Sequence, residues 1–202
     1  MSMTYEEQRF DLPETFQGKL SRESVDEHLT LYSGYVKHTN LILEQIEALR
    51  DDDADANGYQ IGELRRRLGF EFDGMRNHEH YFASLAGGPV ALSDEALKQQ
   101  IEAQWGSYDN WFDEFKQMAK TRGVGWANLT HDPASGQLLN YWNDEQHLGH
   151  LTGTRPVLML DMWEHSFVYD YKPSGKGEYI DDFFANLNWA IPEQTFAEAH
   201  GQ

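Results

Sequence analysis

Val157-Leu158-Met159-Leu160-Asp161-Met162-Trp163-Glu164-His165 is the stretch of this sequence that decides the fold and holds its most informative chemistry. The apolar run after Pro156 is typical of a buried strand, and Asp161 stands at its end with His165 four residues further on. Burying a carboxylate and an imidazole costs desolvation free energy unless a partner offsets it. A metal cation can do so by neutralising the charge of the carboxylate. A buried Asp capping a turn beside a core histidine fits the same spacing, so both interpretations stay open.

The composition limits the kinds of site that this chain can hold. Its 202 residues suit one domain or two small ones, and six Trp, ten Tyr and eleven Phe supply a large core. The absence of Cys excludes disulfides, thiolate zinc sites, iron–sulfur clusters and cysteine nucleophiles. Any metal must be held by His, Asp, Glu, backbone or water, which suits manganese, iron or zinc.

The charge balance is strongly acidic, because 16 Lys and Arg against 34 Asp and Glu give a net charge of −18. This argues against nucleic acid and anionic membranes as partners, since both are bound through basic residues. The sequence shows no signal peptide and no apolar run near the roughly 18 residues that span a bilayer. We expect a soluble, cytoplasmic protein, in which an anionic substrate would need a locally positive route such as Arg76 or Lys172 could provide.

Hydrophobic spacing divides the chain near residue 90. Residues 1–18 read as an irregular arm, and Ser21 as the N-cap of a long helix. The Asp-rich stretch 51–58 is the expected loop before a second helix over 61–85. Two long helices joined by a short connection form an antiparallel hairpin.

Beyond residue 90 the pattern changes to shorter elements. Ser93 and Ser107 are the expected N-caps of two helices. Strands are expected over 123–129, 137–142 and 157–161, and a closing helix over 179–189. This order predicts an α+β fold: a helical-hairpin domain over 1–90, then an α+β domain over 91–202 with a three-stranded antiparallel sheet, and the metal site between the two.

The nine His can be divided by their sequence positions into candidate metal ligands, expected surface residues and residues of a polar loop. His28 and His78 each share a helical face with aromatic residues, and an antiparallel hairpin can bring them to one level beside Asp161 and His165. Three imidazoles and one carboxylate leave a fifth position for solvent, which suits redox or Lewis-acid chemistry. Taken singly, each His could be an ordinary core residue. The His expected at the surface are His38, His80, His131 and His200, and His147 and His150 fall in a polar loop.

Further motifs accompany D-x-W-E-H along most of the chain: His28 with Tyr35-Val36 and Asn40, Asn77-His78 with Leu85, Gly106-Ser107-Tyr108, Gly123-x-Gly125-Trp126, and Tyr179-Ile180 with Asn188-Trp189. Together they resemble the iron/manganese superoxide dismutase family. The resemblance implies conversion of superoxide to dioxygen and hydrogen peroxide by alternate reduction and reoxidation of one Mn or Fe ion per chain. It implies His28, His78, Asp161 and His165 as the metal ligands.

The resemblance also concerns the metal preference. In the family a glutamine hydrogen-bonds the metal-bound solvent, either from four residues before the second His ligand or from the strand after the hairpin turn. The first place holds Gly74, and the second falls on Gln146, with the adjacent His147 as the alternative. This manganese-type pattern slightly favours Mn over Fe.

Four more residues receive roles from the resemblance. Tyr35 would be the gateway tyrosine, and Trp126 and Trp163 aromatic walls of the pocket, although ordinary core packing fits them equally. Glu164 would reach across a homodimer interface to a His ligand of the other subunit; a tetramer, or a merely solvated Glu164, is the alternative.

Two departures from the family pattern predict a divergent branch. His28 precedes Tyr35 by seven residues, one fewer than usual, so either the helix is locally irregular or Tyr35 is displaced. A family His–Tyr pair across the dimer falls here on Tyr32 (or Leu31) and Val168, so that contact is absent.

Two other readings of the same residues compete with a dismutase. One is a different mononuclear enzyme, such as a non-haem iron oxygenase or a zinc hydrolase, and the other is an acidic metal-binding protein without redox turnover. Gln146 and Tyr35 favour the dismutase, because a structural metal site has no use for a solvent-tuning amide.

Overall fold

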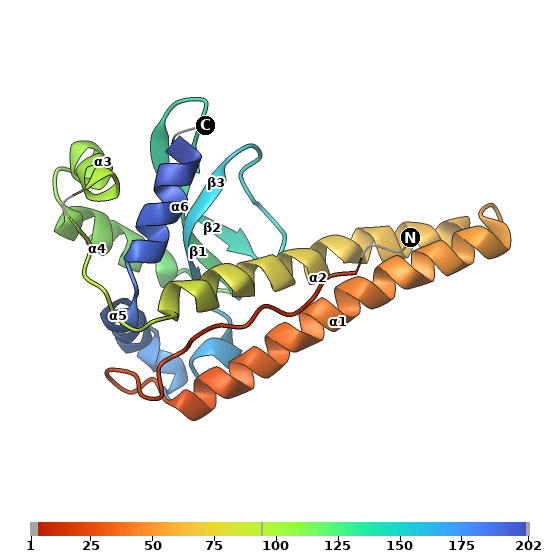
Figure 1. Cartoon of the computed structure of the whole chain (residues 1–202), viewed down its shortest axis with the longest axis horizontal. Coiled ribbons are helices and arrows are strands. Elements are labelled where there is room, and N and C mark those ends of the chain that lie inside the picture. The colour runs from red at the N-terminus through yellow and green to blue at the C-terminus, as the bar shows by residue number, and fades with distance from the viewer. Residues whose placement is uncertain (1–3, 94, 201–202) are drawn as a thin grey trace.

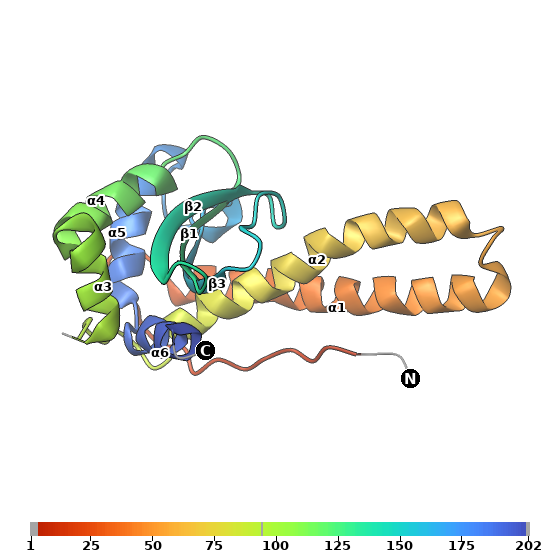
Figure 2. The ribbon, with the colours of Figure 1, turned by 90° about the horizontal axis from the view of Figure 1, so that it is seen from above.

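The computed structural model describes residues 4–93 and 95–200. Two long helices, α1 (Arg22–Asp53) and α2 (Gly58–Leu85), form an antiparallel hairpin whose tip projects far beyond the rest of the molecule (Figures 1 and 2). The remaining chain builds a three-stranded sheet surrounded by shorter helices, which confirms the α+β fold class. Within the described ranges, no helix is both long enough and apolar enough to cross a membrane.

The first helix begins as its sequence predicts. The Ser21 hydroxyl accepts a hydrogen bond from the Ser24 amide at 3.1 Å, which satisfies one of the unpaired donors at a helix start. The helix runs without a break to Asp53, so part of the Asp-rich stretch expected as loop is helical. A continuous α-helix of 3.6 residues per turn returns to the same face after seven residues. His28 and Tyr35 therefore share one face without a local irregularity between them.

An extended N-terminal arm lies against the hairpin (Figure 1). The backbone N–H and C=O of Tyr5 both bond to the Asn40 side-chain amide at 2.8 Å, and the Gln8 amide donates to the Tyr32 hydroxyl. Phe10 packs against Tyr32 with ring centroids 5.9 Å apart. The arm thus covers the aromatic side chains that α1 and α2 present on that face.

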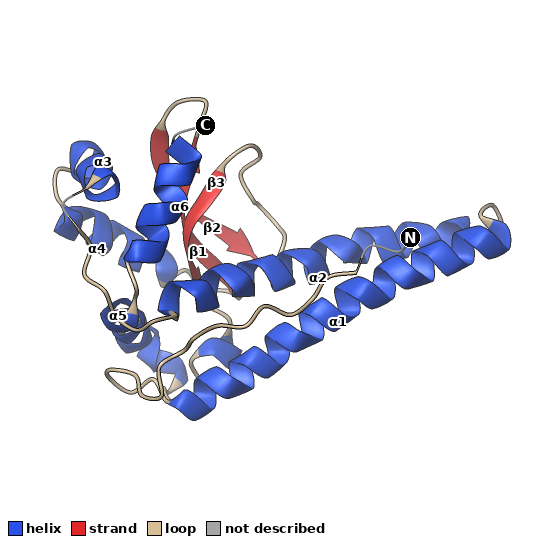
Figure 3. Cartoon of the chain, viewed as in Figure 1, coloured by secondary structure: helices blue, strands red, loops and turns tan. Residues whose placement is uncertain are grey.

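The sheet consists of β1 (Gly125–Asp132), β2 (Gln137–Asp144) and β3 (Arg155–Asp161), with antiparallel order β2-β1-β3. The three strands predicted from the sequence are present. β3 packs on α2 (Figure 3). Its register pairs Trp126 of β1 with Asp161 at the end of β3. This pairing brings the aromatic wall expected from the sequence next to the carboxylate.

The shorter helices correct two predictions. α3 (Ala96–Trp105) has Glu95 at its N-cap position, and Ser93 bonds instead to the Glu193 carboxylate at 2.7 Å, so the predicted cap was wrong. Ser107 does cap α4 (Tyr108–Ala119) by accepting from the Asn110 amide.

The expected single closing helix is two helices, α5 (Lys176–Asn186) and α6 (Ala190–His200). The break lies where the Asn188 amide donates to Ser84 O and its side-chain amide to Ala86 O, at the end of α2. These bonds to another helix replace the bonds that would continue α5.

Candidate metal centre

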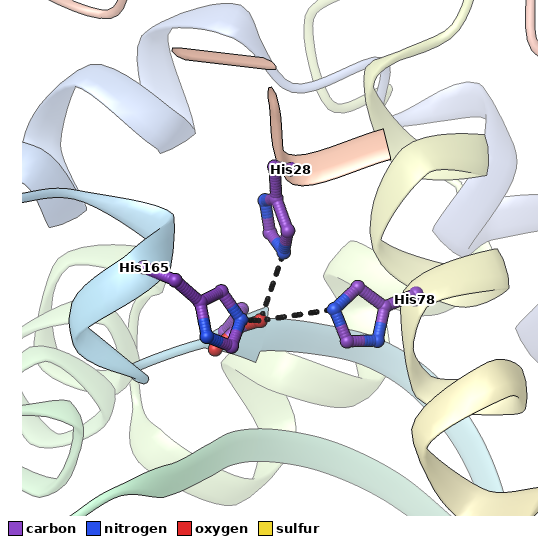
Figure 4. A group of neighbouring side chains, drawn as sticks. His28, His78 and His165 are labelled. Atoms are coloured by element: carbon purple, nitrogen blue, oxygen red, sulfur yellow. Dashed lines mark hydrogen bonds and ion pairs between the residues drawn. The ribbon is translucent and has the colours of Figure 1, made fainter. Parts of the chain in front are cut away.

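Four side chains from separate elements converge at the base of the hairpin (Figure 4). His28 comes from α1, His78 from α2 and Asp161 from the end of β3, and His165 lies in the short helix η1 (Glu164–Ser166) that follows. One potential ligand atom from each lies within 4.8 Å of all the others. The Nε2 atoms of His28, His165 and His78 lie 3.1, 3.2 and 3.6 Å from the same atom, Asp161 Oδ2.

Neighbouring groups orient the ligand atoms toward one point. His78 Nδ1 donates to the Gly74 carbonyl at 2.6 Å, which leaves Nε2 with its lone pair on the side of the cluster. That Nε2 atom is buried and has no hydrogen-bond partner among the described residues. Asp161 Oδ1 accepts from the Trp163 amide at 2.8 Å, so Oδ2 is the oxygen that faces the imidazoles. A buried lone pair without a partner is what a metal site requires before the ion binds.

Burial and the contacts within the cluster together shift the pKa values of its members. Burial lowers the pKa of His78 to about 3, and it also lowers the pKa of His28, although the hydrogen bond to Asp161 acts in the opposite direction. Burial alone would raise the pKa of Asp161, but the neighbouring His165 and His28 outweigh it and hold that pKa well below its usual range. Neutral imidazoles and an ionised carboxylate are the forms that bind a cation. Nitrogen and oxygen donors without sulfur fit Mn or Fe.

Gln146 is fully buried beside this cluster, and its side chain is held at both ends. Its Oε1 accepts from Trp126 Nε1 and its Nε2 donates to the Tyr35 hydroxyl, each at 2.8 Å. Its backbone carbonyl accepts from Asn77 Nδ2 at 2.9 Å and lies 3.0 Å from His150 Nε2. The amide is therefore fixed in one orientation.

The backbone at Glu145 turns the chain so that the next residue enters the interior. Glu145 has φ of 51°, the left-handed region, and no other described residue except glycine has a positive φ. Its amide donates to Val124 O at 3.0 Å, and its carbonyl accepts from Trp163 Nε1 at 3.3 Å. These contacts hold a conformation that costs about 1 kcal/mol or more elsewhere.

His147 lies apart from the hydrogen-bonded group that Gln146 makes. Its ring packs against Phe70 with centroids 5.6 Å apart, and its Cδ2 approaches Gly69. Of these two neighbouring residues, Gln146 is the one that contacts both Tyr35 and Trp126.

The Tyr35 ring fills the space beside Gly74. A β-carbon at position 74 would lie 2.5 Å from Tyr35 Cδ1, far inside van der Waals contact. The Tyr35 ring, 5.0 Å from the His78 ring, occupies the space that a larger side chain on α2 would need. A glutamine at position 74 is thus incompatible with the position of Tyr35.

Aromatic rings surround the ligands. Trp163 stacks on His165 with centroids 5.6 Å apart, and Trp126 meets the His78 ring edge-on at 5.1 Å. Phe70 lies 6.1 Å from Tyr35 and 6.4 Å from Trp163 and was missed in the sequence. The signal was its spacing: Phe70, Gly74 and His78 recur every four residues and so follow one side of α2.

Other sequence-based assignments have mixed outcomes. Glu164 and His38 are exposed, but His131 is only 1% exposed under Phe196, and His80 is half-buried, so both predictions of a surface position were wrong. The His200 side chain lies outside the described part of the chain. Arg76 pairs with Glu79 and lies over Tyr5 of the arm, and Lys172 is exposed.

Comparisons with known proteins agree with this geometry. The profile of the family "Iron/manganese superoxide dismutases, C-terminal domain" matches residues 93–195. The chain is 38% identical to a "Superoxide dismutase [Fe]" of Cupriavidus metallidurans over 83% of each chain. It is 35% identical to a "Superoxide dismutase [Fe]" of Aquifex aeolicus over 93% of this chain and 88% of the relative. It is 34% identical to "Superoxide dismutase [Mn] 1" of Halobacterium salinarum over 85% of this chain and 84% of the relative.

The contact between Gly74 and Tyr35 generates a first prediction. Gly74→Ala should displace Tyr35, lengthen its bond to Gln146 and destabilise the protein by about 1–3 kcal/mol, because the packed interior cannot absorb a methyl group there. Urea denaturation measures the loss. Gly62→Ala, at an α2 position with nothing within 4 Å of the added carbon, is the control and should leave stability unchanged or raised.

The buried imidazoles generate a second prediction, for the metal-free protein. The folded chain keeps His78 neutral down to about pH 3, whereas the unfolded chain binds a proton below the ordinary pKa of 6.5. Stability should therefore fall by about 1–2 kcal/mol for this residue from pH 7 to pH 5, as the unfolded state takes up protons. Denaturation at both pH values should show a smaller difference in His78→Gln and an unchanged one in His38→Gln. Equal pH dependence in all three proteins would contradict the assignment.

Proposed function

This chain belongs to the iron/manganese superoxide dismutase family, and we propose that His28, His78, Asp161 and His165 hold its single catalytic ion. It is an enzyme, an oxidoreductase that converts superoxide into dioxygen and hydrogen peroxide with Mn or Fe. The observation that carries the ligand assignment is the convergence of four potential ligand atoms within 4.8 Å, one of them a buried lone pair without a partner.

When bound there, Mn or Fe supplies one-electron redox chemistry by alternating between two oxidation states. The ligand set gives the ion one negative charge from Asp161, and the aromatic walls Trp126 and Trp163 keep bulk water away from it. The low dielectric of such a site strengthens the influence of each nearby dipole on the ion.

Tyr35 and Gln146 are the proposed proton-handling residues. Burial raises the pKa of Tyr35 above its ordinary value, so its hydroxyl stays protonated at neutral pH. The Tyr35 oxygen accepts from Gln146 Nε2, so its own hydrogen is available to donate. Gln146 Nε2 carries a second hydrogen, which would be available to solvent held beside the four ligand residues. In this proposal Gln146, rather than His147, tunes the metal.

We favour Mn slightly over Fe. The support is the source of the amide, since Gly74 leaves α2 without one and Gln146 supplies it after β2. Relatives named for either metal align with this chain, so reconstitution is the decisive measurement.

We also propose a homodimer in which Glu164 accepts a hydrogen bond from the His165 ring of the second copy. Glu164 is exposed at the start of η1, and His165 is the one of the four ligands that is not fully buried. Val168 and Tyr169, 42% and 55% exposed, extend an apolar surface beside it. That surface takes the place of the absent His–Tyr pair.

Domain division and location are further parts of the proposal. We place the boundary at residue 90, so that the hairpin domain (1–90) supplies His28 and His78 and the α+β domain (91–202) supplies Asp161 and His165. The absence of Cys suits a reducing compartment, and we propose a cytoplasmic location. Cell fractionation checks the location.

Reconstitution is the third prediction and tests the function. Metal-free protein loaded separately with Mn and with Fe should bind about one ion per chain and remove superoxide, with Mn giving the higher rate. His78→Ala should retain neither ion and lose turnover, because the ion loses one of four ligands. His38→Ala, exposed on the same hairpin, is the control. Loss of activity with both metals in the unmodified protein would refute the proposal.

The dimer gives a fourth prediction. Glu164→Ala should weaken self-association at least roughly tenfold, since each lost bond to a charged group costs about 1.5–3 kcal/mol and a two-fold interface contains two. Sedimentation equilibrium measures the effect. Glu44→Ala, exposed on α1, matches the change in charge and should associate like the unmodified protein. Identical association of both variants would exclude Glu164 from the interface.

A further inference from the structure

The charge of the protein opposes the approach of its substrate. The chain carries a net charge of −18, and superoxide is an anion. Repulsion lowers the encounter rate unless a local positive potential at the entrance offsets it, and such local fields change association rates by roughly 10- to 1,000-fold. The cation responsible must lie beside the path from solvent to the ligands.

A path from solvent to the ligands requires incompletely buried side chains near them. His28, His78 and Asp161 are fully buried, whereas four rings around them are only partly covered. We call these four the entrance rings; they are Tyr35, Phe70, His147 and Trp163. Phe70 contacts the other three, at centroid distances of 6.1, 5.6 and 6.4 Å. Phe70 is therefore the ring at which the entrance residues meet.

Arg67 lies directly on this ring. Its Cζ is 3.8 Å from the Phe70 centroid, and its side chain remains 53% exposed. Its guanidinium pairs with Glu71 at 3.1 Å, a carboxylate whose side chain is only 8% exposed. The entrance thus holds a buried negative charge on α2 and a solvent-facing positive charge that compensates it.

The charges of Glu71 and Arg67 both affect the pKa of the Tyr35 hydroxyl. Burial and the charge of Asp161 raise the pKa of Tyr35; Glu71 raises it further, and Arg67 acts in the opposite direction. The neighbouring Arg66 instead pairs with Glu63 on an exposed face, and Lys176 donates to Thr121 and Gly123 carbonyls.

We propose that Arg67 attracts superoxide to the entrance rings and that its pairing with Glu71 sets the strength of this attraction. The inference rests on the proposed ligand site, which gives the path its inner end. Arg67 acts before chemistry, by raising the local concentration of the anion at Phe70. Glu71 acts in the opposite sense, because its carboxylate reduces the positive potential.

The fifth prediction tests the sign and the salt dependence of this effect in the metal-loaded enzyme. At low ionic strength, Arg67→Gln should lower the second-order rate for superoxide about three- to tenfold. Arg67→Lys should recover most of the rate, and Glu71→Gln should raise it. The differences should vanish near 1 M salt, where charges are screened within about 3 Å. Arg66→Gln removes the same charge one residue away and should leave the rate and its salt dependence unchanged.

A second readout needs no metal. Iodide is an anion, and its quenching of tryptophan fluorescence relative to neutral acrylamide reports the potential near Trp163. Arg67→Gln should reduce this ratio and Arg66→Gln should not, with Trp163→Phe identifying the part of the signal that comes from Trp163. Equal rates and equal quenching in the two Arg variants would overturn the proposal. A rate loss in Arg67→Gln that persists at high salt would also overturn it, because it would indicate a packing role through Phe70. Loss of activity in the unmodified enzyme would refute the function instead.

Discussion

The rest of the structure depends on one carboxylate, Asp161, which is buried completely at the end of β3. A buried charge of this kind is costly by several kcal/mol unless surrounding groups compensate it. Here compensation comes from imidazoles on α1, α2 and η1, which are brought to one oxygen at 3.1 to 3.6 Å. Of the three ring nitrogens that face this oxygen, His78 Nε2 is buried without a hydrogen-bond partner among the described residues, and a bound cation would supply that partner. An ion held by these four side chains would add its binding free energy to folding and would join the hairpin to the sheet.

The sequence predicted this part of the molecule well because the information is local. Helical periodicity predicted inward faces for His28 and His78, and the apolar run predicted a buried strand that ends at Asp161. Their assignment as metal ligands came from the family resemblance. The stacking of Trp163 on His165 follows from residues two positions apart on a tight turn. None of these inferences requires knowledge of distant loops.

The errors at His131 and Ser93 share one cause, which is contact with α6, a helix distant in the sequence. The periodicity predicts a last helix that ends at residue 189, whereas α6 extends to His200 and its Phe196 packs on His131. Missing α6 therefore made His131 look like a surface residue between polar neighbours. Ser93 likewise does not cap α3, because its amide donates to the carboxylate of Glu193, which also lies on α6.

The contacts of Gln146 are linked to the packing between α1 and α2. An uninterrupted α1 places Tyr35 on the face of His28, where its ring comes close to α2 and requires glycine at position 74. With no side chain available at that position, the amide must reach Tyr35 from the opposite side, through the left-handed turn at Glu145. In this chain Gly74 and Gln146 are thus linked through one side chain, because the Tyr35 ring fills the space beside Gly74 and its hydroxyl accepts from Gln146.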